Sequence, residues 1–136
     1  MIMKRGVKRA MLVVVVTVMA MASSGSAMQT AATGRLMREK LTHAQRVLEA
    51  LTTSDYALLE RESTALSAAT KQLGWMVLKT PEYGRQSDAF LRATEDLVAA
   101  AKQRDLDLAA MHYVSMTMSC YQCHRYIKNM RIAIAN

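Results

Sequence analysis

The most constraining feature of this chain is a five-residue motif, Cys120-Tyr121-Gln122-Cys123-His124. In this C-x-x-C-H pattern the two thiols and the imidazole stand at positions i, i+3 and i+4, so a helix presents all three on one face. Thiols at this spacing can form thioethers with the two vinyl groups of one haem, and the imidazole can then reach the iron. The motif predicts haem c attached at Cys120 and Cys123, with His124 as the proximal iron ligand.

Three other interpretations of the cysteine pair remain open. A thioredoxin-like dithiol would stand at the start of a helix after a strand, whereas this motif lies inside a long helical pattern. A zinc site usually needs four protein ligands, and outside the motif the chain offers no cysteine and two histidines, His43 and His112. A structural disulfide between the two cysteines is the third alternative. The adjacent histidine and the export signal described next both favour haem.

Residues 1–27 have the three-part layout of a secretory signal peptide. Four basic residues precede an apolar run from Ala10 to Ala22, which only Thr17 interrupts, and small residues follow up to Ala27. We expect cleavage after Ala27 and a periplasmic or otherwise exported protein, where covalent haem attachment takes place. The apolar run is shorter than the roughly 20 residues of a spanning helix. An uncleaved N-terminal anchor is the alternative.

Charge excludes one class of partner. The whole chain carries a formal charge of +7. Removing residues 1–27 would take away four positive charges and no negative ones, which leaves about +3. No Lys/Arg cluster indicates a nucleic-acid surface, so none is expected. Residues 28–136 have the length of a single small domain.

Residues 28–136 predict helix throughout, because no segment alternates with period two and alanine, leucine and methionine dominate. Four amphipathic segments are expected, and they are Thr33–Leu51, Asp55–Leu78, Ser87–Gln103 and Leu106–Ile134. Pro81 and Gly84 mark the main break, and Ser87 is the expected cap of the third segment. The fold class is therefore all-α, an antiparallel up-down-up-down four-helix bundle with the haem attached to the C-terminal helix.

The apolar positions predict which side of each helix is buried. In the first segment the expected stripe is Met37, Leu41, Ala44, Leu48 and Leu51. In the second, Glu60, Arg61, Glu62 and Lys71 are expected on the solvated side, and Trp75 is expected in the core. His43 and His112 are expected at the surface.

An export signal, four helices and a C-x-x-C-H motif close to the C-terminus resemble cytochrome c prime and its low-spin relatives, the class II c-type cytochromes. Members often carry arginine four positions after the proximal histidine, preceded by an aromatic residue. Lys128 matches that position in charge, but Ile127 precedes it and the aromatic residue is Tyr126. Members also often dimerise through their first two helices, so a homodimer is a further expectation from the resemblance.

In this family the residue on the distal side of the iron comes from the first helix, and Met37 is the candidate. Its thioether would give a six-coordinate, low-spin haem, whereas core filling is its alternative role. Leu36 and Leu41 could instead line a five-coordinate distal pocket. The resemblance implies that a basic residue of this helix pairs with a haem propionate, and the candidates are Arg35, Arg38 and Lys40. A solvated basic face is the alternative. Met116 is expected to pack against the haem from the proximal helix.

The expected function is one-electron transfer with periplasmic redox partner proteins, without enzymatic activity. The alternative is a five-coordinate haem protein that binds NO or CO. A peroxidase-type enzyme is a third hypothesis, but the first helix offers no convincing polar acid–base group beside Met37.

Overall fold

The computed structural model describes residues 28, 31–72 and 78–135. The predicted signal peptide (residues 1–27) and Trp75 lie outside the described residues. The chain divides into two compact units, residues 1–35 and residues 36–136. The core and the candidate site described below belong to the second unit.

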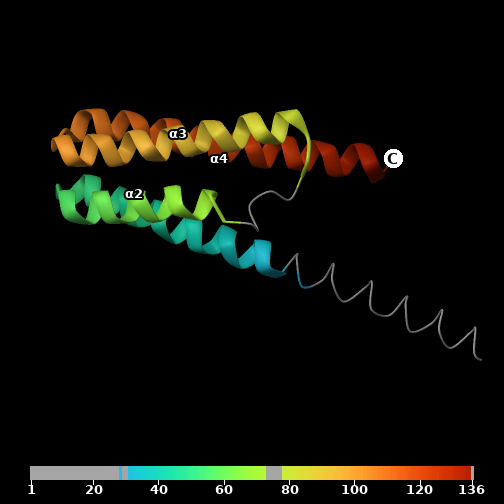
Figure 1. Ribbon diagram of the computed structural model, residues 1–136, viewed down its shortest axis with the longest axis horizontal. Helices are drawn as coiled ribbons and strands as arrows, with labels where there is room; N and C mark the ends of the chain where they lie inside the picture. Colours follow the sequence, from blue (N-terminus) through green and yellow to red (C-terminus); the bar gives the residue numbers. More distant parts are fainter. Residues whose placement is uncertain (1–27, 29–30, 73–77, 136) are drawn as a thin grey trace, which may run out of the picture. The chain divides into compact units, whose positions relative to one another are not determined.

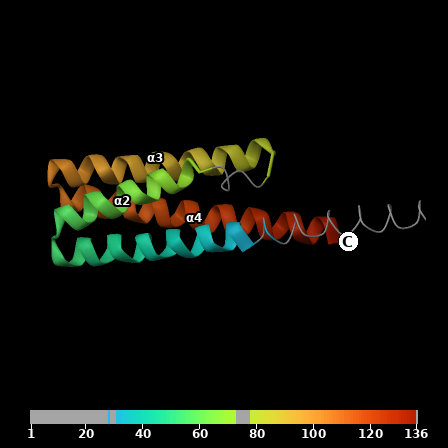
Figure 2. The same ribbon diagram turned by 60° about the horizontal axis from the view of Figure 1, so that its bottom comes forward.

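The described residues form four helices and no strand, so the all-α prediction is confirmed. The N-terminal helix covers residues 31–53, and it is followed by α2 (Tyr56–Thr70), α3 (Pro81–Gln103) and α4 (Leu106–Ala135). Helix α3 packs against both α2 and α4, and Figures 1 and 2 show α3 beside α4. This arrangement is consistent with a four-helix bundle.

Short polar side chains start the helices. The Oδ1 atoms of Asp55 and Asp105 accept hydrogen bonds at 2.9 Å from the backbone amides of Leu58 and Leu108. Each aspartate follows a residue in the left-handed backbone region, Ser54 or Arg104, both with φ of 56°. These tight links let one helix follow another after only two residues.

The third helix begins earlier than predicted. The hydroxyl of Thr80 accepts a hydrogen bond at 3.2 Å from the amide of Tyr83, and Pro81 occupies the first helical turn. Proline is favoured there because its missing N–H has no partner within the helix. The expectation that Ser87 caps this helix is therefore wrong. Ser87 is buried inside α3 and donates a hydrogen bond to the carbonyl oxygen of Tyr83 at 2.9 Å.

The second helix is shorter than predicted, because α2 ends at Thr70 and not near Leu78. The amide of Lys71 bonds back to the carbonyls of Ala68 and Ala69, which closes the last turn. Residues 78–80 have no regular structure, and Thr80 is extended, as expected for a residue before proline.

The core stripe of the N-terminal helix differs from the predicted one. Leu41 and Leu48 are exposed, whereas Leu36, Val47 and Ala50 are buried. Met37, Ala44 and Leu51 are partly buried against the core. The core residues of the described chain are Leu36, Val47, Ala50, Leu58, Leu59, Leu66, Ala69, Phe90, Ala93, Leu97, Ala100, Ala101, Ala109 and Met116. Within the ranges described, no helix is both long enough and apolar enough to cross a membrane.

Candidate haem-binding site

The C-x-x-C-H motif lies within α4, as the periodicity predicted. Cys120 and Cys123 are free thiols and half-buried, and His124 is exposed. Cys120 packs against the hydrophobic core, so the motif lies at the boundary between the core and solvent. A helix turns these three side chains toward the same side because they stand three and four residues apart.

A cavity of about 330 Å³ lies beside the motif, and all four helices contribute to its wall. Its lining residues are Met37, Arg38, Lys40, Leu41, Ala44, Leu66, Phe90, Cys120 and His124. The cavity reaches the surface, because Leu41 and His124 are exposed. Its volume falls at the lower end of the range for ligand pockets, roughly 300–1,000 Å³. The structure thus brings Met37 to the same cavity as Cys120 and His124, which are more than 80 residues away in the sequence.

The pKa values of both thiols are raised, which favours the protonated form. Burial raises the pKa of Cys120 and of Cys123, and the nearby charge of Lys40 opposes this effect only in part. A protonated, half-buried thiol that borders a cavity is a weak metal ligand, since metals bind the thiolate.

Lys40 is a lining residue whose burial the sequence analysis missed. It is buried, and its Nζ atom lies 3.5 Å from the centroid of the Phe90 ring. Burial lowers its pKa from 10.5 to about 8, although the two cysteines act in the opposite direction. The spacing could have indicated this position, because Lys40 follows Met37 by three residues and therefore shares its side of the helix.

The lining can hold a haem by the chemistry of its donors. The thiol of Cys120 and the imidazole of His124 line the cavity, whereas Cys123 is half-buried and is not among the lining residues. Met37, whose side chain carries a thioether sulfur, also lines the cavity, and the remaining wall is mostly apolar. Thiol, imidazole and thioether are the donors that c-type haem proteins use.

The three basic candidates for a propionate partner are now distinguished. Arg38 is exposed and lines the cavity, whereas Lys40 lines it from a buried position. Arg35 is exposed and belongs to the unit of residues 1–35. Arg38 is therefore the candidate whose guanidinium is accessible at the rim of the cavity.

Residues after the motif form a separate contact with the start of α3. The Tyr126 hydroxyl lies 2.9 Å from that of Thr80, Ile127 is half-buried and Lys128 is exposed. The aromatic residue thus has a hydrogen-bonding role at the N-terminus of α3. Met116 is fully buried in the core and is not among the residues that line the cavity.

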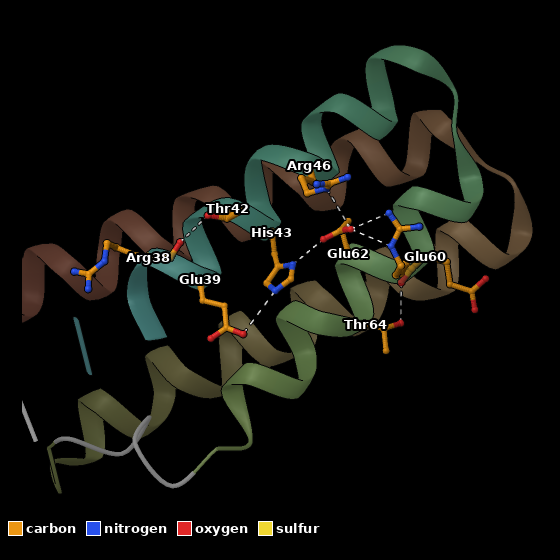
Figure 3. A network of polar contacts seen from close by, with 9 residues as sticks. Arg38, Glu39, Thr42, His43, Arg46, Glu60, Glu62 and Thr64 are labelled. Carbon is orange, nitrogen blue, oxygen red and sulfur yellow. Dashed lines mark hydrogen bonds and ion pairs between the residues drawn. The ribbon is translucent and has the colours of Figure 1, made fainter. Parts of the chain in front are cut away.

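His43 is half-buried, so its expected surface position is only partly correct, and Glu62 is buried, contrary to the expectation. The Nδ1 atom of His43 donates a hydrogen bond at 2.7 Å to the buried carboxylate of Glu62 (Figure 3). Arg61 donates to the same carboxylate at 3.1 Å, and Arg46 lies 3.4 Å from it. Glu39 lies 4.0 Å from the other ring nitrogen of His43. This cluster joins the N-terminal helix to α2.

Burial alone would raise the pKa of Glu62. The hydrogen bonds from His43 and Arg61, together with the charges of His43 and Arg46, outweigh burial and lower that pKa below 4.5. His112 is also half-buried, and its Nδ1 atom lies 3.8 Å from a carboxylate oxygen of Asp96. The expected surface position of His112 is therefore only partly correct.

The alternatives to haem find no support among the described residues. No group of three or more His, Cys, Asp or Glu side chains there could hold a metal ion, as a zinc site requires. No strand precedes the motif in the described ranges, as a thioredoxin-like site requires. Comparisons of the chain with protein-family models, with curated proteins and with solved structures find no match.

Proposed function

We propose that this chain is an exported c-type cytochrome that carries one electron, similar to the low-spin relatives of cytochrome c prime. Haem c is attached at Cys120 and Cys123, His124 is the proximal ligand and Met37 is the distal ligand. The four helices follow one another up-down-up-down in an antiparallel bundle, which the two-residue links before α2 and α4 favour. The partners are periplasmic redox proteins.

One observation carries this proposal: Met37, Cys120 and His124 line a single cavity, to which all four helices contribute. A C-x-x-C-H motif by itself predicts only that haem is attached covalently. The cavity adds a soft donor from the helix that supplies the distal residue in the resembled family. It also adds an apolar wall, from Leu66 and Phe90, that would keep water from the iron.

When bound, haem supplies a reversible one-electron change at its iron. The chain's own residues hold and tune it. Cys120 and Cys123 fix the group covalently, and the imidazole of His124 binds from the proximal side. The thioether of Met37 favours the reduced state, because Met/His ligation raises the reduction potential. Arg38 offers a guanidinium to a propionate at the rim.

A second candidate function is binding of NO or CO at a five-coordinate iron. The observation that favours it is the position of Leu41, which lines the same cavity one turn beyond Met37. If Met37 only fills space, Leu41 and Leu66 leave an apolar distal pocket. Peroxidase chemistry would need an acid–base group on the distal side, and apart from His124 and Cys120 the polar residues that line the cavity are Arg38 and Lys40.

Substitution of the distal candidate tests the proposal. Optical spectra of the purified, exported protein are recorded in the oxidised state, in the reduced state and in the reduced state under CO. We expect a low-spin wild type that ignores CO and a Met37→Ala variant that is high-spin and binds CO. Met111→Ala, at an exposed methionine of α4, is the matched control and should leave all three spectra unchanged. Wild-type and Met37→Ala spectra that coincide would refute the ligand assignment.

A further inference from the structure

The outward side of α4 carries an apolar stripe that neither the core nor the candidate site uses. Met111, Val114, Met118 and Tyr121 are 71%, 61%, 48% and 57% exposed. No Asp, Glu, Lys or Arg occurs from residue 108 to residue 124. We call these four residues the outer stripe. The charged residues that bound it, Asp107 and Arg125, are both exposed.

The outer stripe lies away from the side of α4 that packs inward. Ala109, Met116 and Ser119 are buried, and Cys120 packs against the core. At 100° per residue, Val114 and Met118 are displaced from Met116 by about 160° in either direction, so they lie on the opposite side of the helix. An exposed helix side with methionine and tyrosine but no charge has the composition of a protein interface.

The spacing of the stripe is that of a coiled-coil seam. Positions 111, 114, 118 and 121 follow one another at intervals of three, four and three residues. Asp107 and Arg125 extend the series by four residues at either end, so all six positions share one side of α4. The series is symmetric about Met116, because every member has a counterpart at the same distance on the other side.

We infer that the outer stripe binds the α4 helix of a second copy of this chain, antiparallel and about a two-fold axis that crosses the exposed side of α4 at the level of residue 116. Met111 then faces Tyr121 of the partner subunit, a sulfur–aromatic pair. Val114 faces Met118 of the partner subunit. Asp107 faces Arg125 of the partner subunit, and two-fold symmetry repeats each contact.

Charge complementarity selects this occupant and this direction. In the antiparallel pair both ends of the seam join a carboxylate to a guanidinium. A parallel pair would put Asp107 beside its own copy at one end and Arg125 beside its own copy at the other, which is repulsive at both. The central stripe carries no charge, so two copies of this positively charged chain meet there without repulsion. Arg125 already lies over the Tyr121 ring at 5.6 Å, so the charge adjoins the apolar seam.

This dimer differs from the one that the family resemblance implied, which uses the first two helices. It also goes beyond the proposed function, since none of its contacts involves a haem ligand. The mass of the protein reports on the dimer and the optical spectrum reports on the iron, so the two proposals can fail separately.

The first test is the molar mass of the full protein by sedimentation equilibrium over a wide concentration range. We expect a concentration-dependent dimer for the wild type and a monomer for Val114→Glu, because that change puts two carboxylates near the two-fold axis. Leu48→Glu, at an exposed leucine of the N-terminal helix, is the matched control and should leave the dimer intact. The far-UV circular dichroism spectrum of Val114→Glu should equal that of the wild type, which shows that the variant is folded.

The second test reverses the end charges. Asp107→Arg and Arg125→Asp should each weaken dimerisation about tenfold, since each creates two like-charge pairs. The double variant should restore the wild-type dissociation constant. A wild type that is monomeric throughout, or a dimer that Leu48→Glu breaks and Val114→Glu does not, would overturn the inference. A double variant weaker than both single variants would overturn the antiparallel register.

Discussion

Glu62 and Lys40 are both charged side chains in the interior of the described chain, with relative exposures of 5% and 7%. Their pKa values are both lowered, with opposite meanings. For Glu62 a lowered pKa favours the charged form, because hydrogen bonds and cations outweigh burial. For Lys40 it favours the neutral form, because burial outweighs the charges of the cysteines. The environment therefore stabilises the charge of Glu62 and destabilises that of Lys40.

This difference separates the Glu62 cluster from the cavity beside the motif. Glu62 is held by hydrogen bonds from His43 and Arg61 and by an ion pair with Arg46, so its charge links two helices. Lys40 lies over an aromatic ring in the wall of a cavity, where burial works against its charge. Charged groups whose surroundings disfavour the charged form are typical of binding and catalytic sites. The cavity beside the motif, which is the candidate site, has this property at Lys40.

The largest expected effect is loss of the Glu62 carboxylate. Glu62→Ala should lower the free energy of unfolding by about 3 kcal/mol, because His43, Arg46 and Arg61 would then converge without an acceptor. Glu60→Ala is the matched control, since its half-exposed carboxylate lies 3.8 Å from Lys102 and should contribute under about 1 kcal/mol. Urea denaturation monitored by circular dichroism measures both. Equal losses for the two variants would remove the distinction between a structural and a surface carboxylate.

Removal of the Lys40 charge should have the opposite sign. Lys40→Met keeps the length of the side chain and should raise the free energy of unfolding by about 1–3 kcal/mol at pH 7, since a buried charge is lost. Lys71→Met changes an exposed lysine that lies 3.2 Å from Glu95, and it should lower stability slightly. The same denaturation experiment applies. A loss of more than about 1 kcal/mol for Lys40→Met would show that the ammonium group is needed for folding.

The smallest expected effect is a pH dependence at Glu62. Its pKa is lower in the folded chain than in the unfolded one, so the unfolded state binds the proton first as the pH falls. The stabilisation is fully present above the ordinary pKa of 4.5 and is lost as the pH falls through the folded value. The groups that face this carboxylate are His43, Arg46 and Arg61.

A comparison of two proteins isolates the contribution of Glu62 to the pH dependence of stability. The free energy of unfolding of the wild type minus that of Glu62→Gln is measured from pH 7 to pH 3. We expect a difference of about 1 kcal/mol at pH 7 that shrinks in acid. A difference that stays constant over this range would mean that the carboxylate is not held below its ordinary pKa.

Much of the helical framework could be predicted from the sequence, because helix propensity and periodicity are local signals. The predicted fourth segment, Leu106–Ile134, agrees closely with α4. The start of α3 was missed because proline was interpreted as a helix breaker, although it is favoured in the first turn after a cap such as Thr80. The correct prediction of α4 and the missed start of α3 both depended on residues only a few positions apart.

Burial was harder to predict where polar side chains enter the core. The inward side of the N-terminal helix runs through Leu36, Lys40, His43, Val47 and Ala50, and two of these five residues are polar. A pattern that counts only apolar residues shifts the stripe by one position, toward Leu41 and Leu48. Glu62 was assigned to solvent for the same reason, since its partners come from another helix as well as its own.

The candidate site also has one part that follows from local sequence and one part that depends on packing between distant segments. The shared side of Cys120, Cys123 and His124 follows from helical spacing alone. The presence of Met37 in the same cavity was a prediction from family resemblance, and the wall formed by Leu66 and Phe90 depends on packing between distant segments. The outer stripe of α4 was not foreseen, because apolar residues of that helix were considered only as core.

The optical spectrum of the exported, purified protein tests the central claim most directly. It is recorded in the oxidised state, in the reduced state and in the reduced state under CO. A parallel sample is first denatured and extracted, which removes any haem that is not covalently bound. We predict covalent haem in a low-spin state that CO does not change, as expected for His124 and Met37 as axial ligands. A high-spin spectrum that shifts under CO would contradict Met37 ligation and favour gas binding. Absence of covalent haem would contradict the account as a whole.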